Sequence, residues 1–237
     1  MLIKVRTQTV RNMKFDESDH FQMSLFGKVG LDSGSWAKSL KVSSRIILIC
    51  ILGFILALLG LRLLGTATDA SIATAVYHFV PDDLVPLIYA IATVGDLIWA
   101  PLVFWLYVFR KDKNEWTSSL ILAVGMVMAM GLTDLLKAFF NLPRPFQVPS
   151  LGIVARGSIP TSAGFPSGHT TNASTVATVI LSRYPAWRGP FIALAISTGV
   201  SMVILGLHFP SDVIGGAFLG IFCGTFALSM AKIRSSN

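Results

Sequence analysis

Residues 117–140 read TSSLILAVGMVMAMGLTDLLKAFF, with Asp134 and Lys137 as the charged side chains. A helix of this length rises roughly 36 Å, enough to cross about 30 Å of hydrocarbon. The whole chain has the same character, because 53% of its 237 residues are hydrophobic and 13% are charged. An ordinary soluble domain has about 25% charged residues. With a mean hydropathy of +0.68, the composition excludes a soluble globule and predicts a chain that lies largely in lipid.

Six stretches are long and apolar enough to be considered as membrane spans. Three are residues 46–65, 117–140 and 168–184, and the other three lie between residues 83 and 110, between 188 and 208, and between 212 and 232. The fourth is short and rich in Thr and Ser, and Arg62 near the end of the first is expected to extend toward the interface. The sequence therefore predicts an all-α fold, an integral membrane bundle of six transmembrane helices at residues 46–231. Residues 1–45 and 232–237 are interpreted as cytoplasmic tails.

The distribution of basic residues predicts how the bundle is oriented. Of the 19 Lys and Arg residues, 15 lie in the N-terminal tail, in the second-to-third and fourth-to-fifth connections, and at the C-terminus. The positive-inside rule puts these segments, and so both termini, on the cytoplasmic side of the inner membrane. The net charge of +7 is scattered between apolar segments, so no basic face for nucleic acid is indicated.

Three polar clusters cannot be explained by contact with lipid, where ionisable residues are costly and usually functional. The first is Lys137 with Arg144-Pro145, the second is the run 166–169 (PSGH), and the third is His208 with Asp212. In the predicted topology, the third span ends, the fourth begins, and the fifth and sixth meet on the outer side. We therefore expect all three clusters to lie on one face, open to the periplasm or exterior.

The first two clusters contain groups suited to binding a phosphate. Lys137 and Arg144 supply positive charges, and a guanidinium can hold two phosphate oxygens at once. Ser167 is predicted to be the residue that caps the fourth span, with Gly168 following it. The free backbone N–H groups at this helix start would then point toward the same anion.

The histidines supply the reactive groups of a phosphoryl transfer. The carboxylate of Asp212 would accept the Nδ1 proton of His208, leaving Nε2 free to attack phosphorus. Pro210 suits the first turn of the sixth span, which would place Asp212 near a helix N-terminus. His169 is predicted to be the general acid that protonates the leaving oxygen. This scheme uses no metal and no cofactor.

The ordered motifs Lys137-x6-Arg144-Pro145, Pro166-Ser167-Gly168-His169 and Ser201…His208-x3-Asp212 resemble the signature of the type 2 phosphatidic acid phosphatase superfamily. The resemblance covers about residues 46–231. It implies a six-helix membrane core, metal-independent catalysis through a phosphohistidine, and lipid phosphates or diphosphates as substrates. Such substrates include phosphatidic acid, phosphatidylglycerol phosphate, polyprenyl diphosphate and lipid A phosphate.

One position departs from that signature. The third family motif has Arg after its Ser, whereas Met202 follows Ser201 here. Losing one charged hydrogen bond to a phosphate costs roughly 1.5–3 kcal/mol. Arg156, in the outer loop, is the basic residue considered as a substitute.

Three functions are compatible with these residues: a lipid phosphate phosphatase, a lipid phosphotransferase, and a lipid-phosphate binder or transporter that has lost its chemistry. Retention of both His169 and His208 argues against the third. Asp96 is interpreted as a helix–helix polar contact, and Asp134 is placed to pair with Lys137 at i,i+3 spacing. The expected partners are the substrate and membrane lipids, and the sequence leaves the oligomeric state open.

Overall fold

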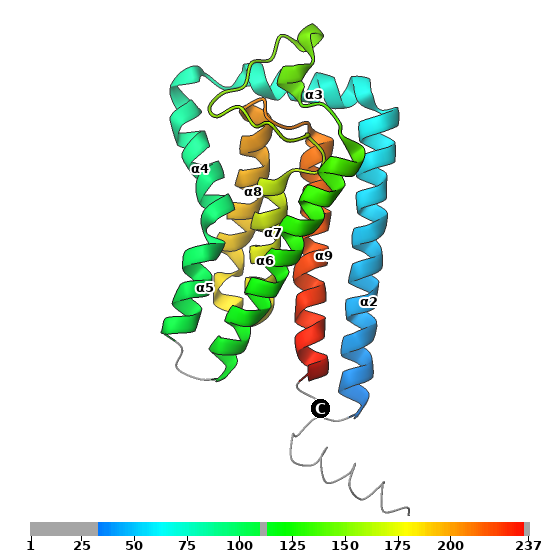
Figure 1. Ribbon diagram of the computed structural model, residues 1–237, viewed down its shortest axis with the longest axis vertical. Coiled ribbons are helices and arrows are strands. Elements are labelled where there is room, and N and C mark those ends of the chain that lie inside the picture. Colours follow the sequence, from blue (N-terminus) through cyan, green and yellow to red (C-terminus); the bar gives the residue numbers. More distant parts are fainter. Residues whose placement is uncertain (1–32, 110–112, 235–237) are drawn as a thin grey trace, which may run out of the picture. The chain divides into compact units, whose positions relative to one another are not determined.

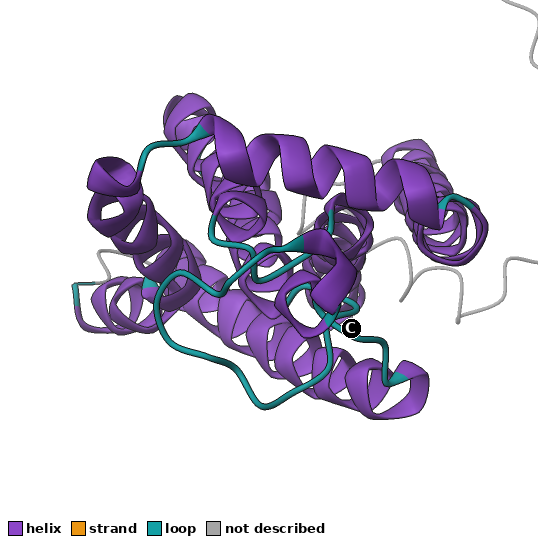
Figure 2. Cartoon of the chain, turned by 90° about the horizontal axis from the view of Figure 1, so that it is seen from above, coloured by secondary structure: helices purple, strands orange, loops and turns teal. Residues whose placement is uncertain are grey.

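The computed structural model describes the backbone of residues 33–109 and 113–234, and the side chains of residues 44–109 and 116–231. All regular elements in these ranges are helices (Figure 2). In chain order they are α2 (Ser33–Leu56), the π-helix η1 (Ala57–Leu64), α3 (Thr66–Phe79), η2 (Asp82–Leu84), α4 (Val85–Leu97), α5 (Trp99–Val108), α6 (Lys113–Phe140), η3 (Pro145–Gln147), η4 (Pro149–Leu151), α7 (Gly168–Arg183), η5 (Pro185–Trp187), α8 (Arg188–Ile204) and α9 (Pro210–Arg234). The arrangement described below is that of the compact unit at residues 43–237. The predicted tails, residues 1–45 and 232–237, lie mostly outside the described residues.

The predicted all-α membrane fold is confirmed, while the count of six spans stays a prediction. Within the described ranges, four helical segments are long and apolar enough to cross a membrane: Ser44–Leu64, Trp116–Leu151, Pro185–Ile204 and Pro210–Ala231. A fifth is formed if α4 and α5, which meet at a bend of 45°, count as one span. The remaining predicted span corresponds to α7, which has 16 residues and does not reach that length.

Helix α7 lies in the centre of the bundle (Figure 1), where it packs against α4, α6, α8 and α9. Most of its Thr and Ser side chains are buried, and several of their hydroxyls donate to backbone carbonyls within the bundle. The hydroxyl of Thr175 lies 2.8 Å from the carbonyl of Thr171 and 3.2 Å from that of Gly220, and can donate to either. A helix surrounded by protein does not need the apolar surface that lipid contact requires, which explains the weak hydropathy of residues 168–184.

Three glycines bring α9 close to α7. A Cβ atom on Gly216 would lie 2.5 Å from the carbonyl oxygen of Ser167, and one on Gly220 would lie 2.4 Å from that of Thr171. Gly224 follows at the same spacing, and its Cβ would lie 2.7 Å from the Cβ of Thr178. Small residues at every fourth position let two helix backbones approach closely. This contact fixes the start of α7 against the start of α9, where two of the three polar clusters lie.

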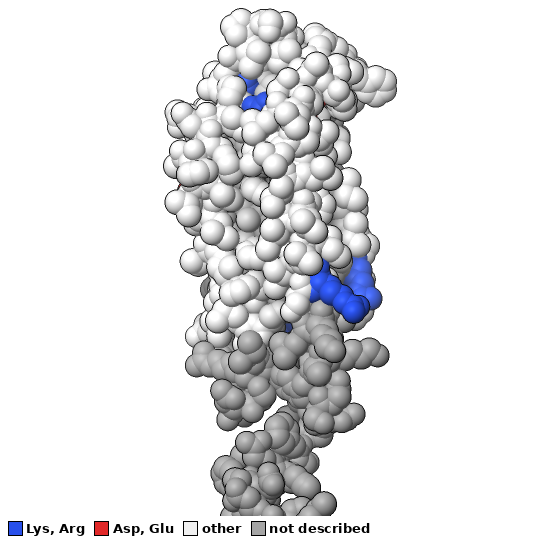
Figure 3. Space-filling view, turned by 90° about the vertical axis from the view of Figure 1, so that its right-hand side faces the viewer, with Lys and Arg blue, Asp and Glu red and all other residues white. Residues whose placement is uncertain are grey.

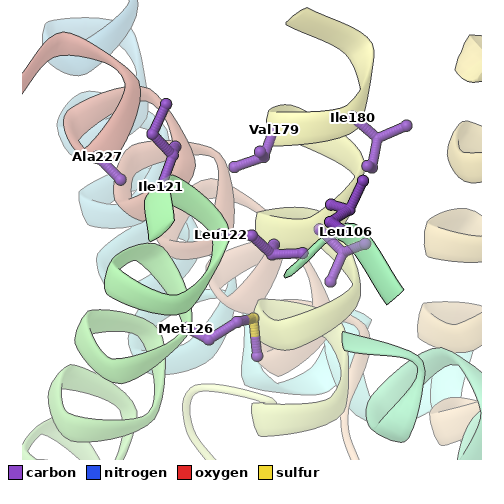
Figure 4. Close-up of a cluster of buried hydrophobic side chains, with 8 residues drawn as sticks. Leu106, Ile121, Leu122, Met126, Val179, Ile180 and Ala227 are labelled. Atoms are coloured by element: carbon purple, nitrogen blue, oxygen red, sulfur yellow. The ribbon is translucent and has the colours of Figure 1, made fainter. Parts of the chain in front are cut away.

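Apolar packing holds the opposite end of the bundle together. Leu106 of α5, Leu122 and Met126 of α6, and Val179 of α7 form a buried cluster (Figure 4) that Ala227 of α9 completes. Many apolar side chains on the outside of the helices are exposed, as expected for surfaces that contact lipid. On the face shown in Figure 3, the visible Lys and Arg side chains lie near the two ends, with an uncharged surface between them.

Helix α3 and the connection between α6 and α7 cover the other end. α3 lies across the helix ends there, and the loop passes beside it (Figures 1 and 2). Tyr77 of α3, Ile153 of the loop, Val203 of α8 and Phe209 form one buried cluster. This end of the bundle carries the polar residues that the sequence singled out.

Candidate active site

The three polar clusters meet around one cavity of about 230 Å³. Lys137, Arg144, Gly168, His169 and His208 all contribute to its wall. Met202 of α8 also lines the cavity and is 1% exposed. Residues from α6, the following loop, α7 and the α8–α9 turn are thus brought to a single site, which suits a small anionic group.

His208 and Asp212 form a buried pair at the α8–α9 turn. The Nδ1 atom of His208 lies 3.4 Å from Oδ2 of Asp212, and the backbone N–H of Phe209 donates to the same oxygen at 2.9 Å. Helix α9 begins at Pro210, as predicted, so the carboxylate lies in its first turn. Because Nδ1 faces a carboxylate, the neutral imidazole carries its proton there and leaves Nε2 as an acceptor.

Burial lowers the pKa of His208 well below its usual value, and the positive charges of Arg144 and Lys137 and the neighbouring His169 lower it further. The ring is 2% exposed. Its neutral form is therefore the ground state at physiological pH, which is the form that a nitrogen nucleophile requires.

Arg144 joins the loop to this histidine. Its Nη1 lies 3.0 Å from Nε2 of His208 and donates to the carbonyl of Leu207 at 2.9 Å. Its Nε donates to the carbonyl of Ser162 at 2.8 Å, and Nη2 reaches the Ser162 hydroxyl and the Ala163 carbonyl, each at 3.2 Å. The guanidinium is thus held rigidly beside the reactive ring nitrogen.

Lys137 supplies a second cation from the last turn of α6. Its ammonium donates to the carbonyl of Ala163 at 2.6 Å, and the carbonyl of Gly164 lies at 3.5 Å. Asp134 lines the same cavity, but among the described ion pairs none joins it to Lys137. The loop carbonyls that hold Lys137 and Arg144 keep the two charges side by side.

His169, in the first turn of α7, faces a carboxylate of its own. Its Nε2 lies 3.7 Å from Oδ2 of Asp96 on α4. The amide of Asn172 donates to the other oxygen of Asp96 at 2.7 Å, so the interpretation of Asp96 as a helix–helix contact is confirmed. The same carboxylate lies beside the ring that was predicted to be the acid.

Of the residues predicted to bind the phosphate, two are not part of the cavity wall. Ser167 does precede α7, but its hydroxyl makes no capping bond to the backbone and instead accepts from Thr170 at 3.0 Å. Arg156 pairs with Asp82 at 3.0 Å, and its guanidinium lies 4.0 Å from the ring centre of Tyr77. The structure therefore gives Arg156 other partners than the cavity.

Two buried charges were not predicted from the sequence. Arg62 was expected to extend to the interface, but it is 7% exposed and faces Asp212. Asp69 of α3 accepts from the backbone N–H of Ser211 at 2.9 Å and from its hydroxyl. Burial raises the pKa of Asp69, against the effects of these hydrogen bonds and of Arg62. The sequence held a signal for Arg62 alone, which is a charge inside an otherwise apolar predicted span.

Within the described residues, no group of three or more His, Cys, Asp or Glu side chains is arranged to hold a metal ion. Of the carboxylates near the cavity, Asp96 faces His169, and Asp212 faces both His208 and Arg62.

Comparison with known proteins identifies the family. Residues 118–235 match the model of the PAP2 superfamily, and the chain belongs to this superfamily. It is 29% identical over 126 residues to an undecaprenyl-diphosphatase of Sulfolobus acidocaldarius, which is 53% of this chain and 59% of that protein. It is 35% identical over 105 residues to a lipid A 1-phosphatase of Rhizobium etli, which is 43% of this chain and 44% of that protein. Both matches cover less than two thirds of the relative.

A solved structure shares the fold. The crystal structure of a PAP2-type phosphatidylglycerolphosphate phosphatase from Bacillus subtilis matches with a TM-score of 0.64 at 20% identity, over 79% of this chain and 96% of that one. The resemblance drawn from the three motifs is thereby confirmed at the level of family and fold.

Proposed function

We propose that the protein removes phosphate from a lipid phosphate or diphosphate through a phosphohistidine at His208. The observation that carries this proposal is the cavity in which His208, paired with Asp212, faces Arg144 and Lys137, with His169 on the same wall. A phosphate binder needs the cations alone. An enzyme that transfers a phosphoryl group also needs a nucleophile and an acid beside those cations.

In the first step, Nε2 of His208 attacks phosphorus, and the bond from phosphorus to the lipid oxygen breaks. His169 donates a proton to that oxygen, while Arg144 and Lys137 balance the charge on the other phosphoryl oxygens. Asp212 stabilises the ring as its positive charge develops. In the second step, water attacks phosphorus and gives a proton to His169, the P–N bond breaks, and phosphate and neutral His208 result.

This route is complete with side chains of the chain itself, and we expect it to proceed without a metal ion. The test is phosphate release by the detergent-solubilised protein from phosphatidic acid, phosphatidylglycerol phosphate, a polyprenyl diphosphate and lipid A, each with and without EDTA. Release from at least one lipid, abolished by His208→Ala and reduced nearly as far by His169→Ala, is the expected result. Loss of release in EDTA, restored by a divalent ion, would contradict the scheme.

The same experiment separates hydrolysis from transfer. The assay is repeated with an added phosphate acceptor other than water. If the lipid loses its phosphate only when this acceptor is present, the protein is a phosphotransferase. If no lipid is hydrolysed or used for transfer, and no phosphate from a radiolabelled lipid becomes bound to the protein, the catalytic proposal fails.

We further propose six spans, with α7 as the fourth, both termini in the cytoplasm, and the cavity open to the outer side of the inner membrane. The support is the distribution of Lys and Arg along the sequence, because 15 of the 19 lie in segments that the predicted topology puts on one side. A cysteine at Ser158, in the loop beside the cavity, should react with a membrane-impermeant reagent in intact cells. A cysteine at Lys113 is the matched control and should not react, and the reverse pattern would invert the orientation.

A further inference from the structure

Arg62 is a buried cation directly behind the nucleophile's partner. Its Nε faces Oδ1 of Asp212 at 3.3 Å, and its Nη2 donates to the carbonyl of Pro143, the residue before Arg144. The guanidinium carbon lies 4.3 Å from the ring centre of Phe209. One side chain therefore contacts the carboxylate, the turn that carries His208, and the loop that carries Arg144.

The π-helix η1 turns Arg62 toward the bundle. In this element, Ala57, Leu58 and Arg62 are buried, while Leu59, Leu63 and Leu64 are exposed. A π-helix has a wider turn than an α-helix and is rare, and such segments occur frequently at functional sites. Here the segment directs Arg62, the one charged residue of η1, inward against the start of α9.

The two oxygens of Asp212 have separate tasks. Oδ2 receives the backbone N–H of Phe209 and faces Nδ1 of His208, while Oδ1 faces Arg62. A carboxylate that is 0% exposed is costly as an anion unless a cation compensates it. Only the anionic form can both accept the Nδ1 proton and stabilise the positive ring that forms when Nε2 attacks.

We infer that Arg62 is a positioning residue that keeps Asp212 ionised and oriented toward His208. The inference rests on the proposed function and extends it to a residue outside the family match at 118–235. Arg62 is not among the residues that line the cavity, so it does not bind the phosphate. Its effect on the reaction passes through Asp212.

The test is a double-mutant cycle on kcat and KM, with the lipid that the unaltered protein hydrolyses fastest. Arg62→Gln keeps a hydrogen-bond donor but removes the charge, and we expect kcat to fall by about 10–100-fold while KM changes by less than about threefold. Arg62→Lys restores the charge and should recover most of kcat. In an Asp212→Asn background, adding Arg62→Gln should change kcat by less than about twofold.

The matched control is Arg183→Gln. Arg183 is also an arginine that joins two helices, since its Nε donates to the hydroxyl of Ser118 at 2.9 Å, but it ends α7 while the cavity lies at its start. This change should leave kcat within about twofold of the unaltered protein. Thermal unfolding in detergent is recorded for every variant, so that a loss of fold is not read as a loss of positioning.

Each outcome decides the matter. If Arg62→Gln lowers kcat by the same factor with and without Asp212→Asn, or alters KM alone, Arg62 does not act through Asp212. If Arg62→Gln does not fold, the variant that combines Arg62→Gln with Asp212→Asn is measured instead, because it leaves no unpaired buried charge. A kcat equal to that of Asp212→Asn alone supports the inference, and a further tenfold loss overturns it. If the unaltered protein releases no phosphate, the proposed function fails instead.

Discussion

Replacing Arg144 by Lys separates the charge at the cavity from the geometry that holds it. The guanidinium has hydrogen-bond partners on both sides: the Ser162–Ala163 segment, and the turn at Leu207 and His208. A lysine has one nitrogen and cannot reach both segments at once. The positive charge remains in Arg144→Lys, but the planar fork that can hold two phosphoryl oxygens is lost.

The size of the effect follows from the bonds that are lost. One charged hydrogen bond to the phosphoryl group is worth about 1.5–3 kcal/mol, and each 1.36 kcal/mol is tenfold in rate. Arg144→Lys should therefore lower kcat/KM by about 10–100-fold. Arg144→Met also loses the charge and the second bond, and should lower it by roughly 10²–10⁴-fold.

The assay is phosphate release in detergent over a range of lipid concentrations, with thermal unfolding measured on the same preparations. Arg183→Lys is the control for replacing a helix-joining arginine far from the cavity. If Arg144→Lys matched the unaltered protein, the charge alone would suffice and the fork would have no role. If Arg144→Met stayed within about threefold, Arg144 would not contact the substrate in the transition state.

Three further predictions follow from particular contacts. Because the pKa of His208 is lowered well below 6.5, its neutral form persists as the pH falls, so the acidic limb that it causes in kcat/KM should lie well below pH 6.5; a half-point at 6.5 in the pH–rate profile would contradict this. Met202→Arg places a third cation in the cavity wall and should raise kcat/KM by on the order of tenfold, whereas unchanged kinetics would mean that position 202 does not face the phosphate. Asp69→Ala leaves the N–H and hydroxyl of Ser211 without their buried partner and should lower the free energy of unfolding by about 1–3 kcal/mol, measured by denaturant titration in detergent.

The sequence predicted the long apolar helices, though not α3, and the meeting of the polar clusters, because both depend on local patterns. Apolar runs mark where the chain can lie in lipid, and the parity of the spans decides which ends share a face. Lys137, Arg144, His169 and His208 could be found in this way, since each lies at the end of a predicted span. The central place of α7 could not, because hydropathy measures contact with lipid and α7 contacts protein.

The burial of Arg62 and Asp69 could not be predicted from the sequence for a different reason. A lone arginine near the end of an apolar span can either extend to the interface or turn into the bundle. It turns inward when a buried anion is there to pair with it. That anion is Asp212, which lies 150 residues later in the chain. Asp69 likewise faces Ser211 across the fold.

These two contacts explain why the N-terminal helices belong to the site although the family match begins at residue 118. The turn that carries His208 is short, and besides His208 itself it gives the Asp212 carboxylate the backbone N–H of Phe209. Arg62 supplies the charge that a buried carboxylate needs, and Asp69 fixes the first turn of α9 through Ser211. A fragment containing only residues 118–235 would retain every motif residue and lose both of these partners. We therefore expect it to bind lipid phosphate more readily than it transfers phosphate, because the cations of the cavity would remain while the nucleophile's partner would not be held.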